Sequence, residues 1–441
     1  MEVAELARRV VTTLRSCGHQ AYFVGGCVRD LLLGEQPKDY DIATDARPDQ
    51  ITALFPESGL VGAHFGVVLV REQAAQVEVA TFRSDHAYVD GRHPARVDFE
   101  TDPQQDVLRR DFTINALLLD PDRNEVLDFV GGRADLHNRV VRAIGDPEAR
   151  FREDHLRMLR AVRFAARLSY RIDPATFQAM RRLRGFIQTV SAERLRDELV
   201  RILTEGGARH GFELLDESGL LSEILPEVAA MKGVEQPPEY HPEGDVWTHT
   251  LLLLEHLRNP TQTLALGALL HDVGKPPTFR VAGRIRFDGH VEKGVEMAAA
   301  ILTRLRFSND EIRRVTALVA NHMRFKDAPQ MKVSTLKRFL RLENFPEHVE
   351  LHRLDCIASH GQLGNYDLIQ RKMQELPIDE IKPQPLISGD DLIAAGYHPG
   401  PAFAVILAAV EDAQLESMIH SKEDAMSLVR AQFQIPDGVP R

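Results

Sequence analysis

Hydrophobic and polar residues follow two different patterns along this chain. Up to about residue 145, short apolar and β-branched runs are separated by turns that contain Gly, Pro and Asp, which predicts strands at 21–24, 41–44, 66–70 and 77–81. From about residue 146, apolar residues recur at spacings of three and four, which predicts helices. The pattern therefore indicates an α+β protein whose strands are confined to its first part.

Breaks in this pattern divide the chain into modules. A length of 441 residues suggests about three modules, because a single core rarely grows beyond 100–200 residues. Prolines interrupt the helical pattern at 234–238 and again around 377–385. We expect four segments: a mixed head at 1–145, a helical neck at 146–232, a second helical domain at 233–380 and a helical tail at 381–441.

Composition and charge narrow the class of protein. Hydrophobic residues make up 44% and charged residues 27%, which is typical of globular chains. The formal net charge of −11 excludes a basic nucleic-acid coat but permits a local basic surface. The three cysteines are scattered, so neither a disulfide framework nor a CxxC zinc site is expected. The N-terminal stretch reads as an amphipathic helix and no apolar run is long enough to span a membrane, so we expect a cytoplasmic protein.

Two aspartates and a glycine turn are the most informative feature of the head. An apolar strand ends at Gly25-Gly26 and a helix that carries Arg29 follows, an arrangement that lets backbone N–H groups approach a phosphate. Asp39 and Asp41 are two residues apart, so on a strand their carboxylates point to one face. Each signal alone has an ordinary alternative, a tight connection or a solvated strand end. Together they favour a metal site.

The predicted ion is Mg²⁺. Two adjacent carboxylates repel each other and need a cation or a proton, and Mg²⁺ commonly links one or two carboxylates to substrate phosphates. Such ions would activate an attacking hydroxyl and stabilise a pyrophosphate leaving group. Glu78, in the strand at 77–81, is either a third carboxylate of this site or an exposed strand residue.

Four motifs resemble class II tRNA nucleotidyltransferases, the CCA-adding enzymes, whose close kin are the bacterial poly(A) polymerases. The motifs occur in the family's order over about the first 200 residues: GGCVRDLLLG at 25–34, KDYDIAT at 38–44, RRDFTINA at 109–116 and REDHLRMLRAVRFAA at 152–166. The resemblance implies a polymerase-β-like nucleotidyltransferase head. It also implies that Asp39 and Asp41 hold the catalytic metals, that Gly26 and Arg29 meet the triphosphate and that Arg110 supports the nucleotide.

The neck carries the residues that would select the base. In the family, the pattern EDxxR recognises the incoming nucleotide, and Glu153, Asp154 and Arg157 match it. A carboxylate facing the amino group and a guanidinium facing the ring nitrogen accept both cytosine and adenine, whereas uracil and guanine leave both groups unpaired. Each such mismatch costs roughly 1–3 kcal/mol.

Further arginines surround this motif. Arg160 and Arg163 continue the three-residue spacing, and we expect them to join Asp154 and Arg157 in one stripe on a single helix that binds the nucleotide. The alternative is a solvated, salt-bridged helix face. Other arginines would supply a basic track for an RNA backbone: Arg181, Arg182, Arg184, Arg194, Arg196 and Arg201. The polar segment 84–97 is a candidate for a mobile loop that switches the enzyme from C to A.

The second helical domain contains six spaced metal-ligand residues. They follow the order H…HD…H…H…D and resemble the HD phosphohydrolase superfamily: His249, His271, Asp272, His290, His322 and Asp355. In that family His249, His271, Asp272 and Asp355 would hold one divalent metal, and His290 and His322 would support a second. Mixed imidazole and carboxylate ligands suit Mg²⁺, Mn²⁺, Ni²⁺ or Fe. The implied activity is hydrolysis of a phosphoester, such as a 2′,3′-cyclic or terminal phosphate at an RNA end.

These features predict an enzyme that adds CCA to the 3′ end of tRNA from CTP and ATP and also carries a phosphohydrolase. The tail from residue 386 resembles the C-terminal segment of HD-bearing CCA-adding enzymes and is expected to support the tRNA body or a dimer contact. Alternatives within the family are an A-only-adding enzyme and a poly(A) polymerase, although residues 60–70 lack the basic pair expected of the polymerase. Alternatives of other classes are a phosphohydrolase with a degenerate head and an RNA-binding adaptor. The oligomeric state is not predicted.

Overall fold

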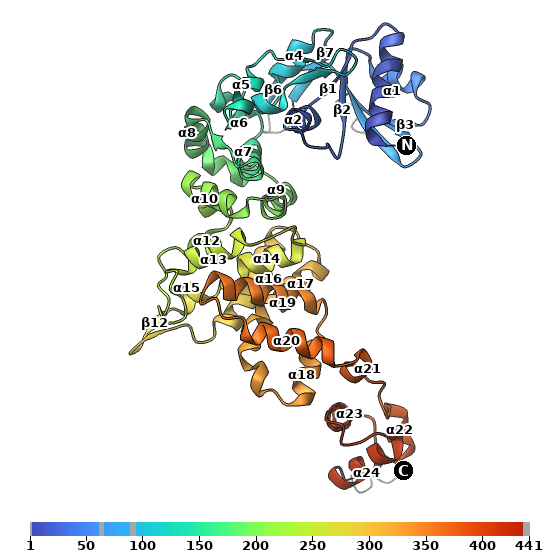
Figure 1. The fold of residues 1–441 in the computed structure, drawn as a ribbon, viewed down its shortest axis with the longest axis vertical. Coiled ribbons are helices and arrows are strands. Elements are labelled where there is room, and N and C mark those ends of the chain that lie inside the picture. The colour runs from blue at the N-terminus through green and yellow to red at the C-terminus, as the bar shows by residue number, and fades with distance from the viewer. Residues whose placement is uncertain (1, 61–65, 89–93, 435–441) are drawn as a thin grey trace. The chain divides into compact units, whose positions relative to one another are not determined.

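The computed structural model describes residues 2–60, 66–88 and 94–434 (Figure 1). Contacts divide the chain into two compact units. The first comprises residues 1–232, 257–265 and 301–307, and the second comprises residues 233–256, 266–300 and 308–441. Within the described ranges, no helix combines the length and the hydropathy that crossing a bilayer requires.

A seven-stranded sheet forms the centre of the head. Its strand order is β3-β4-β5-β2-β1-β8-β9. Strands β2 and β5 pair in parallel, and the other neighbouring strands of this sheet pair antiparallel. The strands are β1 (Ala21–Val24), β2 (Asp41–Thr44), β3 (Ser58–Leu60), β4 (Val67–Glu72), β5 (Ala75–Thr81), β8 (Leu118–Asp120) and β9 (Glu125–Leu127). All four predicted strands are confirmed, with β4 and β5 shifted by one or two residues at their ends.

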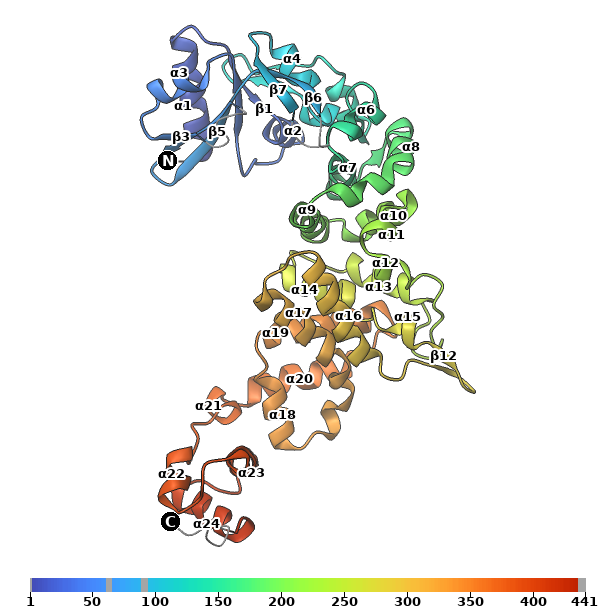
Figure 2. The ribbon, with the colours of Figure 1, turned by 180° about the vertical axis from the view of Figure 1, so that it is seen from behind.

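The two faces of the sheet differ in chemistry. Helices α1 (Val3–Ser16) and α3 (Pro48–Leu54) lie side by side (Figure 2) and bury one face, where Ile42 and Val79 join their core. Since side chains alternate along a strand, Asp41 and Glu78 belong to the opposite face. Part of that face packs on α4 (Pro103–Leu108) and neighbouring apolar residues. The carboxylates therefore lie on a sheet whose opposite face is packed against α1 and α3.

The segment predicted as a mobile loop is largely a β-hairpin. Strands β6 (Arg83–Tyr88) and β7 (Pro94–Phe99) pair antiparallel, whereas residues 89–93 lie outside the described ranges. The strands, RSDHAY and PARVDF, lack a clear alternation of polar and apolar residues, so the sequence pattern did not indicate a ladder here.

Small elements lie between the strands of the head sheet, between the sheet and the neck, or within the neck. They are α2 (Gly26–Leu32), η2 (Thr113–Asn115), α5 (Gly132–His137) and the short pair β10 (Val140–Val141) and β11 (Arg171–Ile172). The neck is helical, as predicted: α6 (Pro147–Glu153), α7 (Arg157–Leu168), α8 (Pro174–Leu183), η3 (Arg184–Thr189), α9 (Ala192–Thr204), α10 (Ala208–Ser218), α11 (Leu220–Ile224) and α12 (Pro226–Ala229).

The second unit is almost entirely helical. Its site-bearing elements are α13 (Val246–Glu255), α14 (Gln262–Leu270), α15 (Lys275–Thr278), α16 (His290–Arg304), α17 (Asn309–Asn321), η4 (His322–Gln330) and α19 (Phe345–Ala358). A small hairpin joins β12 (Arg280–Val281) to β13 (Ile285–Arg286). The remaining helices are α18 (Val333–Leu340), α20 (Gly364–Glu375), α21 (Ile378–Ile381), α22 (Gly389–Ala394), α23 (Pro401–Leu415) and α24 (Lys422–Gln432), and the last three share a separate small core.

Candidate active sites of the head and the helical domain

Three carboxylates converge on the open face of the head sheet. Asp41 is the first residue of β2, Asp39 lies just before the strand, and Glu78 is the in-register partner of Asp41 on β5. Burial and the nearby Glu78 charge raise the pKa of Asp41 to about 6, although Arg110 opposes this shift. The cluster therefore carries excess negative charge, which is the condition that a bound cation relieves. These hard oxygen donors fit Mg²⁺.

The glycine turn lies against this cluster. Gly25 has a φ of 80° and precedes the first turn of α2, directly after β1. A Cβ at Gly25 would be 3.4 Å from Asp41 Oδ2 and 3.7 Å from an Arg110 guanidinium nitrogen. A side chain here would be strained and would narrow the space beside the carboxylates.

Arg110 and Arg29, the two arginines predicted to bind the nucleotide, differ in their surroundings. Arg110 lies beside Asp41 and is oriented by Asp106, whose buried carboxylate accepts hydrogen bonds from both Arg109 and Arg110. Arg29, in contrast, is only 2% exposed, because its guanidinium donates to Asn115 at 2.6 Å and to Asp30 at 2.7 Å. Arg29 thus braces α2 against the segment at 109–116.

The motif EDxxR spans a junction between two helices, which corrects the prediction of one continuous stripe. Helix α6 ends at Glu153, Asp154 is extended, and α7 begins at Arg157. Asp154 breaks the helix because its Oδ1 accepts the Leu156 backbone N–H at 3.1 Å. Arg194 of α9 also donates to Asp154 Oδ2 at 2.8 Å, so Arg194, which was expected in a basic track for an RNA backbone, is paired with the base-selecting carboxylate.

Arg157 is oriented by three partners. Its guanidinium donates to Glu153 Oε2 at 2.6 Å, to the Arg150 carbonyl at 3.3 Å and to the Arg109 carbonyl at 3.2 Å. Asp154 and Arg157 are held by groups other than each other's side chain: Asp154 by Arg194 and the Leu156 N–H, and Arg157 by Glu153 and two backbone carbonyls. Both side chains are thereby fixed before any nucleotide arrives.

The next two arginines of α7 are committed to carboxylates of the protein. Arg160 donates to Asp111 Oδ2 at 2.8 Å, and Arg163, 4% exposed, donates to Glu198 Oε2 at 2.7 Å. Arg163 also lies near Glu205. For these two residues, the ion-paired alternative describes the structure better than the predicted contact with a nucleotide.

One short segment touches both parts of the site. Arg110 reaches toward Asp41, the Arg109 carbonyl accepts from Arg157, and Asp111 accepts from Arg160. The carboxylate cluster of the sheet and the first turns of α7 are therefore linked through three consecutive residues. Asp106 and Asp111 were not singled out from the sequence, although both stand in or next to the RRDFTINA motif.

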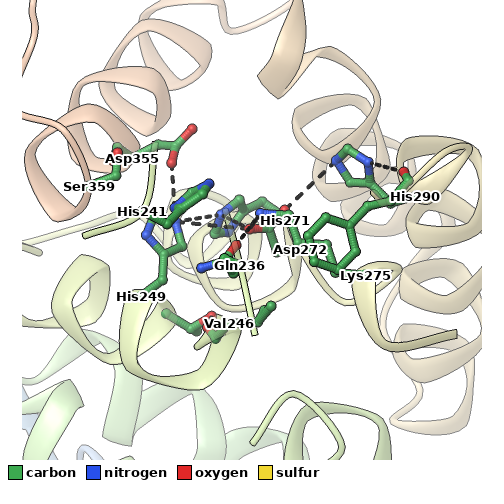
Figure 3. Close-up of polar contacts among 12 residues, drawn as sticks. Gln236, His241, Val246, His249, His271, Asp272, Lys275, His290, Asp355 and Ser359 are labelled. Carbon is green, nitrogen blue, oxygen red and sulfur yellow. Dashed lines mark hydrogen bonds and ion pairs between the residues drawn. The ribbon is translucent and has the colours of Figure 1, made fainter. Parts of the chain in front are cut away.

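The six predicted ligands of the second unit come together in one buried centre, and Figure 3 labels all of them except His322. Ligand atoms of His249, His271 and Asp355 lie within 4.8 Å of one another, and so do those of Asp272, His290 and His322. Asp272 stands between the two sets: Oδ2 is 3.2 Å from His271 Nε2, while Oδ1 is 3.9 Å from His290 Nε2 and 3.8 Å from His322 Nε2. The arrangement differs from the prediction in placing Asp272 with the second set as well as the first.

Buried polar atoms without partners indicate that this centre fits divalent metal. The Nε2 atoms of His290 and His322 are buried and have no hydrogen-bond partner among the described residues. Burial lowers the pKa of His322 to about 4, against the attraction of Asp272, so this imidazole is neutral and offers a lone pair. Imidazole nitrogens and carboxylate oxygens in such a mixed set suit transition metals and Mg²⁺.

Charged neighbours balance the two aspartates of the centre. Lys275 donates to Asp272 Oδ2 at 2.7 Å, and with the imidazole of His271 it outweighs burial and lowers the pKa of Asp272 well below its usual value. Burial opposes protonation of His249, but hydrogen bonds with Asp355 and Glu243 outweigh it and raise the pKa of His249 to about 9. Glu243 was not predicted; the available signal was an acidic residue between two histidines, His241 and His249.

Known families match most of the chain. Residues 21–142 match the poly A polymerase head domain, residues 169–232 a probable RNA- and SrmB-binding site of polymerase A, and residues 290–429 a putative tRNA nucleotidyltransferase domain 2. The CCA-adding enzyme of Lactobacillus johnsonii is 30% identical over 97% of this chain and 96% of that protein. The chain belongs to the tRNA nucleotidyltransferase/poly(A) polymerase family.

Two further relatives of this nucleotidyltransferase refine the comparison. The CC-adding tRNA nucleotidyltransferase of Thermus thermophilus is 34% identical over 93% of each chain. The structure of the Bacillus stearothermophilus CCA-adding enzyme in complex with CTP superposes with a TM-score of 0.75, at 25% identity over 98% of this chain and 99% of that one. The α+β fold with a nucleotidyltransferase head is therefore confirmed, and the motifs that suggested the family identified it correctly.

Proposed function

We propose that this nucleotidyltransferase adds CCA to the 3′ end of tRNA, using CTP and ATP without a nucleic-acid template. The observation that carries the proposal is the link through residues 109–111, which joins the carboxylates of the head to the base-selecting residues of the neck. Support also comes from relatives named CCA-adding enzymes, one of them solved with CTP.

In the proposed reaction, the 3′-hydroxyl of the tRNA attacks the α-phosphorus of the nucleotide. The bond between the α-phosphorus and the bridging oxygen breaks, and pyrophosphate leaves. Asp39 and Asp41 would hold Mg²⁺, with Glu78 beside them; the ion supplies charge stabilisation for the phosphates and activates the hydroxyl. Arg110, oriented by Asp106, lies where it would neutralise the triphosphate. Gly25 and Gly26 leave room for that group.

Base selection is assigned to Asp154 and Arg157. Asp154 would accept from the amino group of cytosine or adenine, and Arg157 would donate to the adjacent ring nitrogen. Both side chains are already oriented, Asp154 by Arg194 and Leu156 N–H and Arg157 by Glu153 and the Arg109 carbonyl. A preorganised pair costs little ordering entropy when the nucleotide binds. Arg160 and Arg163 would support base selection indirectly, through their ion pairs with carboxylates of the protein.

The number and order of additions form the decisive test. Purified protein receives tRNA that ends at the discriminator base, with CTP alone, ATP alone or both. The proposal predicts two additions with CTP alone, none with ATP alone and three with both. The Thermus relative makes CC addition the main rival, and it predicts two additions under both CTP-containing conditions. Incorporation of A solely onto tRNA ending in CC, or long A tails on many RNAs, would instead support the A-only enzyme or the polymerase.

The histidine–aspartate centre supports a second candidate function, hydrolysis of a phosphoester. A divalent metal held by His249, His271, Asp272, His290, His322 and Asp355 would supply an activated water and stabilise the charge of the phosphoryl group. Lys275, paired with Asp272, adds a fixed positive charge. In the proposed reaction, water adds to phosphorus and one P–O ester bond of a 2′,3′-cyclic phosphate breaks, leaving a phosphomonoester. Conversion of an RNA 2′,3′-cyclic end to a 2′- or 3′-phosphomonoester that remains on the RNA, absent in an Asp272→Asn variant, tests this function.

A further inference from the structure

The four histidines of the metal centre share one feature of geometry. Each ring uses Nδ1 in a hydrogen bond to an acceptor and turns Nε2 toward the aspartates. For three rings the acceptor is a backbone carbonyl three residues earlier in the chain, at 2.9 Å for His271, 2.9 Å for His290 and 2.7 Å for His322. A carbonyl can only accept, so Nδ1 carries the proton and Nε2 keeps its lone pair for a metal.

His249 differs because it lies inside a helix. The other three histidines stand at helix boundaries, but His249 is the fourth residue of α13. There the Asp245 carbonyl accepts the His249 N–H and the Val246 carbonyl accepts the Thr250 hydroxyl. The Nδ1 atom of the His249 ring has a side-chain acceptor instead.

Glu243 takes the role that a carbonyl has for the other three rings. Its Oε1 lies 2.8 Å from His249 Nδ1 and also 2.8 Å from His241 Nδ1. The Glu243 side chain is 6% exposed and that of His249 is fully buried, so water does not replace this contact. On the other side of the ring, His249 Nε2 is 3.1 Å from Asp355 Oδ1 and 3.3 Å from His271 Nε2.

We propose that Glu243 is a positioning residue of the metal centre, which fixes the His249 ring with Nε2 directed at the metal and Nδ1 protonated. This inference rests on the proposed hydrolytic centre. A carboxylate behind a ligating histidine orients the ring and makes it a stronger donor, and losing such a partner typically costs 10- to 100-fold in metal affinity. His241, the second donor to Glu243, supports the carboxylate from outside.

The test measures Mn²⁺ binding to the full chain by the electron paramagnetic resonance of free Mn²⁺. All variants carry Asp39→Asn and Asp41→Asn, which removes the proposed sites of the head from the titration. We expect Glu243→Ala to weaken Mn²⁺ binding about 10- to 100-fold and Glu243→Gln to weaken it less, because the amide oxygen still accepts one hydrogen bond. The control, Glu239→Gln, alters an exposed acid of the same loop and should leave affinity unchanged.

A second readout separates positioning from a general loss of structure. Nitrogen-15 spectra of the metal-free histidine rings should show that Glu243→Ala alters the signals of the His249 ring nitrogens while those of His271, His290 and His322 stay as in the parent. Thermal unfolding identifies any variant that fails to fold, in which case Glu243→Gln, isosteric with the native residue, decides between the two explanations.

The two proposals fail in different ways. If the parent binds no Mn²⁺ and Asp272→Asn changes nothing, the hydrolytic centre itself is wrong. If the parent binds Mn²⁺ and Asp272→Asn abolishes binding, but Glu243→Ala and Glu243→Gln bind as the parent does, the centre stands and the role of Glu243 is refuted. Weakened binding with an unchanged His249 spectrum would also refute positioning, since it would indicate direct ligation by Glu243.

Discussion

The head and the second unit each gather acidic residues, but they balance the charge in opposite ways. In the head, burial and Glu78 raise the pKa of Asp41 to about 6, and Arg110 offsets this only in part. In the histidine–aspartate centre, the pKa values of Asp272 and Asp355 fall despite burial, because His271, Lys275 and His249 lie against them. The first site keeps an excess of negative charge in spite of Arg110, whereas the second contains positive charge that balances its aspartates.

This difference in charge predicts how each site would bind a metal ion. The excess negative charge of the first cluster would be balanced by a cation that arrives with the substrate, as when Mg²⁺ enters with a nucleoside triphosphate. A centre with oriented imidazoles and internal counter-charges is suited to a resident metal that stays between turnovers. Four perturbations test this contrast.

The largest expected effect comes from the head carboxylates. Asp41→Asn should reduce nucleotide addition on the order of 10³-fold, because metal ions contribute several kcal/mol at a phosphoryl transition state and each 1.36 kcal/mol is tenfold. Hydrolysis of a 2′,3′-cyclic end should be unchanged. Primer extension and electrophoretic detection of the opened 2′,3′-cyclic end on the same preparation measure both, with Asp49→Asn on the exposed start of α3 as the control. Parallel loss of both activities would show that the centres are not independent.

The reciprocal change is Asp272→Asn. Since this residue contacts both ligand sets, its loss should lower hydrolysis and retained metal on the order of 100-fold while addition stays within about twofold. Metal content after dialysis and the same two assays provide the measurement. Glu296→Gln, an exposed change on α16, serves as the matched control. Retention of metal in Asp272→Asn would contradict the assignment.

Acidity should affect the two centres differently. His249, with a pKa of about 9, is protonated at neutral pH, and a metal must displace that proton; Asp41, with a pKa of about 6, is already ionised. Mn²⁺ binding at the histidine centre should therefore strengthen by up to about tenfold per pH unit from pH 7 toward 9, whereas binding at the head should be flat there and weaken below pH 6. Calorimetric titrations of Asp41→Asn and Asp272→Asn isolate each centre. Equal pH profiles would contradict the contrast.

The smallest expected effect concerns base selection. Arg194→Met removes the guanidinium that holds Asp154, but the Leu156 N–H still orients the carboxylate. The preference for CTP over UTP should fall about three- to tenfold, which corresponds to losing about one hydrogen bond of orientation. Single-nucleotide kinetics measure the ratio. Arg209→Met, which breaks an unrelated arginine–glutamate pair on α10, should leave it unchanged; an equal fall in CTP and UTP use would indicate general damage instead.

The sequence predicted the elements and the ligands more fully than their orientation. Periodicity located the strands at Asp41 and Val77. The resemblance of the residue order to the HD phosphohydrolase superfamily named six ligand-type residues, and the structure places these residues near one another. The sequence could not show that Asp154 interrupts a helix. An aspartate that caps a helix and an aspartate inside a helix fit the same three-residue spacing. The sequence also missed Asp106, Asp111 and Glu243, which act through other side chains. Such partners become visible only when distant segments are placed in contact.

The most direct test is a crystal structure of the chain with CTP and Mn²⁺, using anomalous scattering to locate the ion. We expect manganese about 2.1–2.2 Å from oxygens of Asp39 and Asp41, with the triphosphate beside Arg110. We also expect the cytosine amino group and N3 within about 3 Å of Asp154 and Arg157. A nucleotide bound with its base away from these two residues, or manganese absent from the head carboxylates, would contradict the proposed addition of nucleotides at this site.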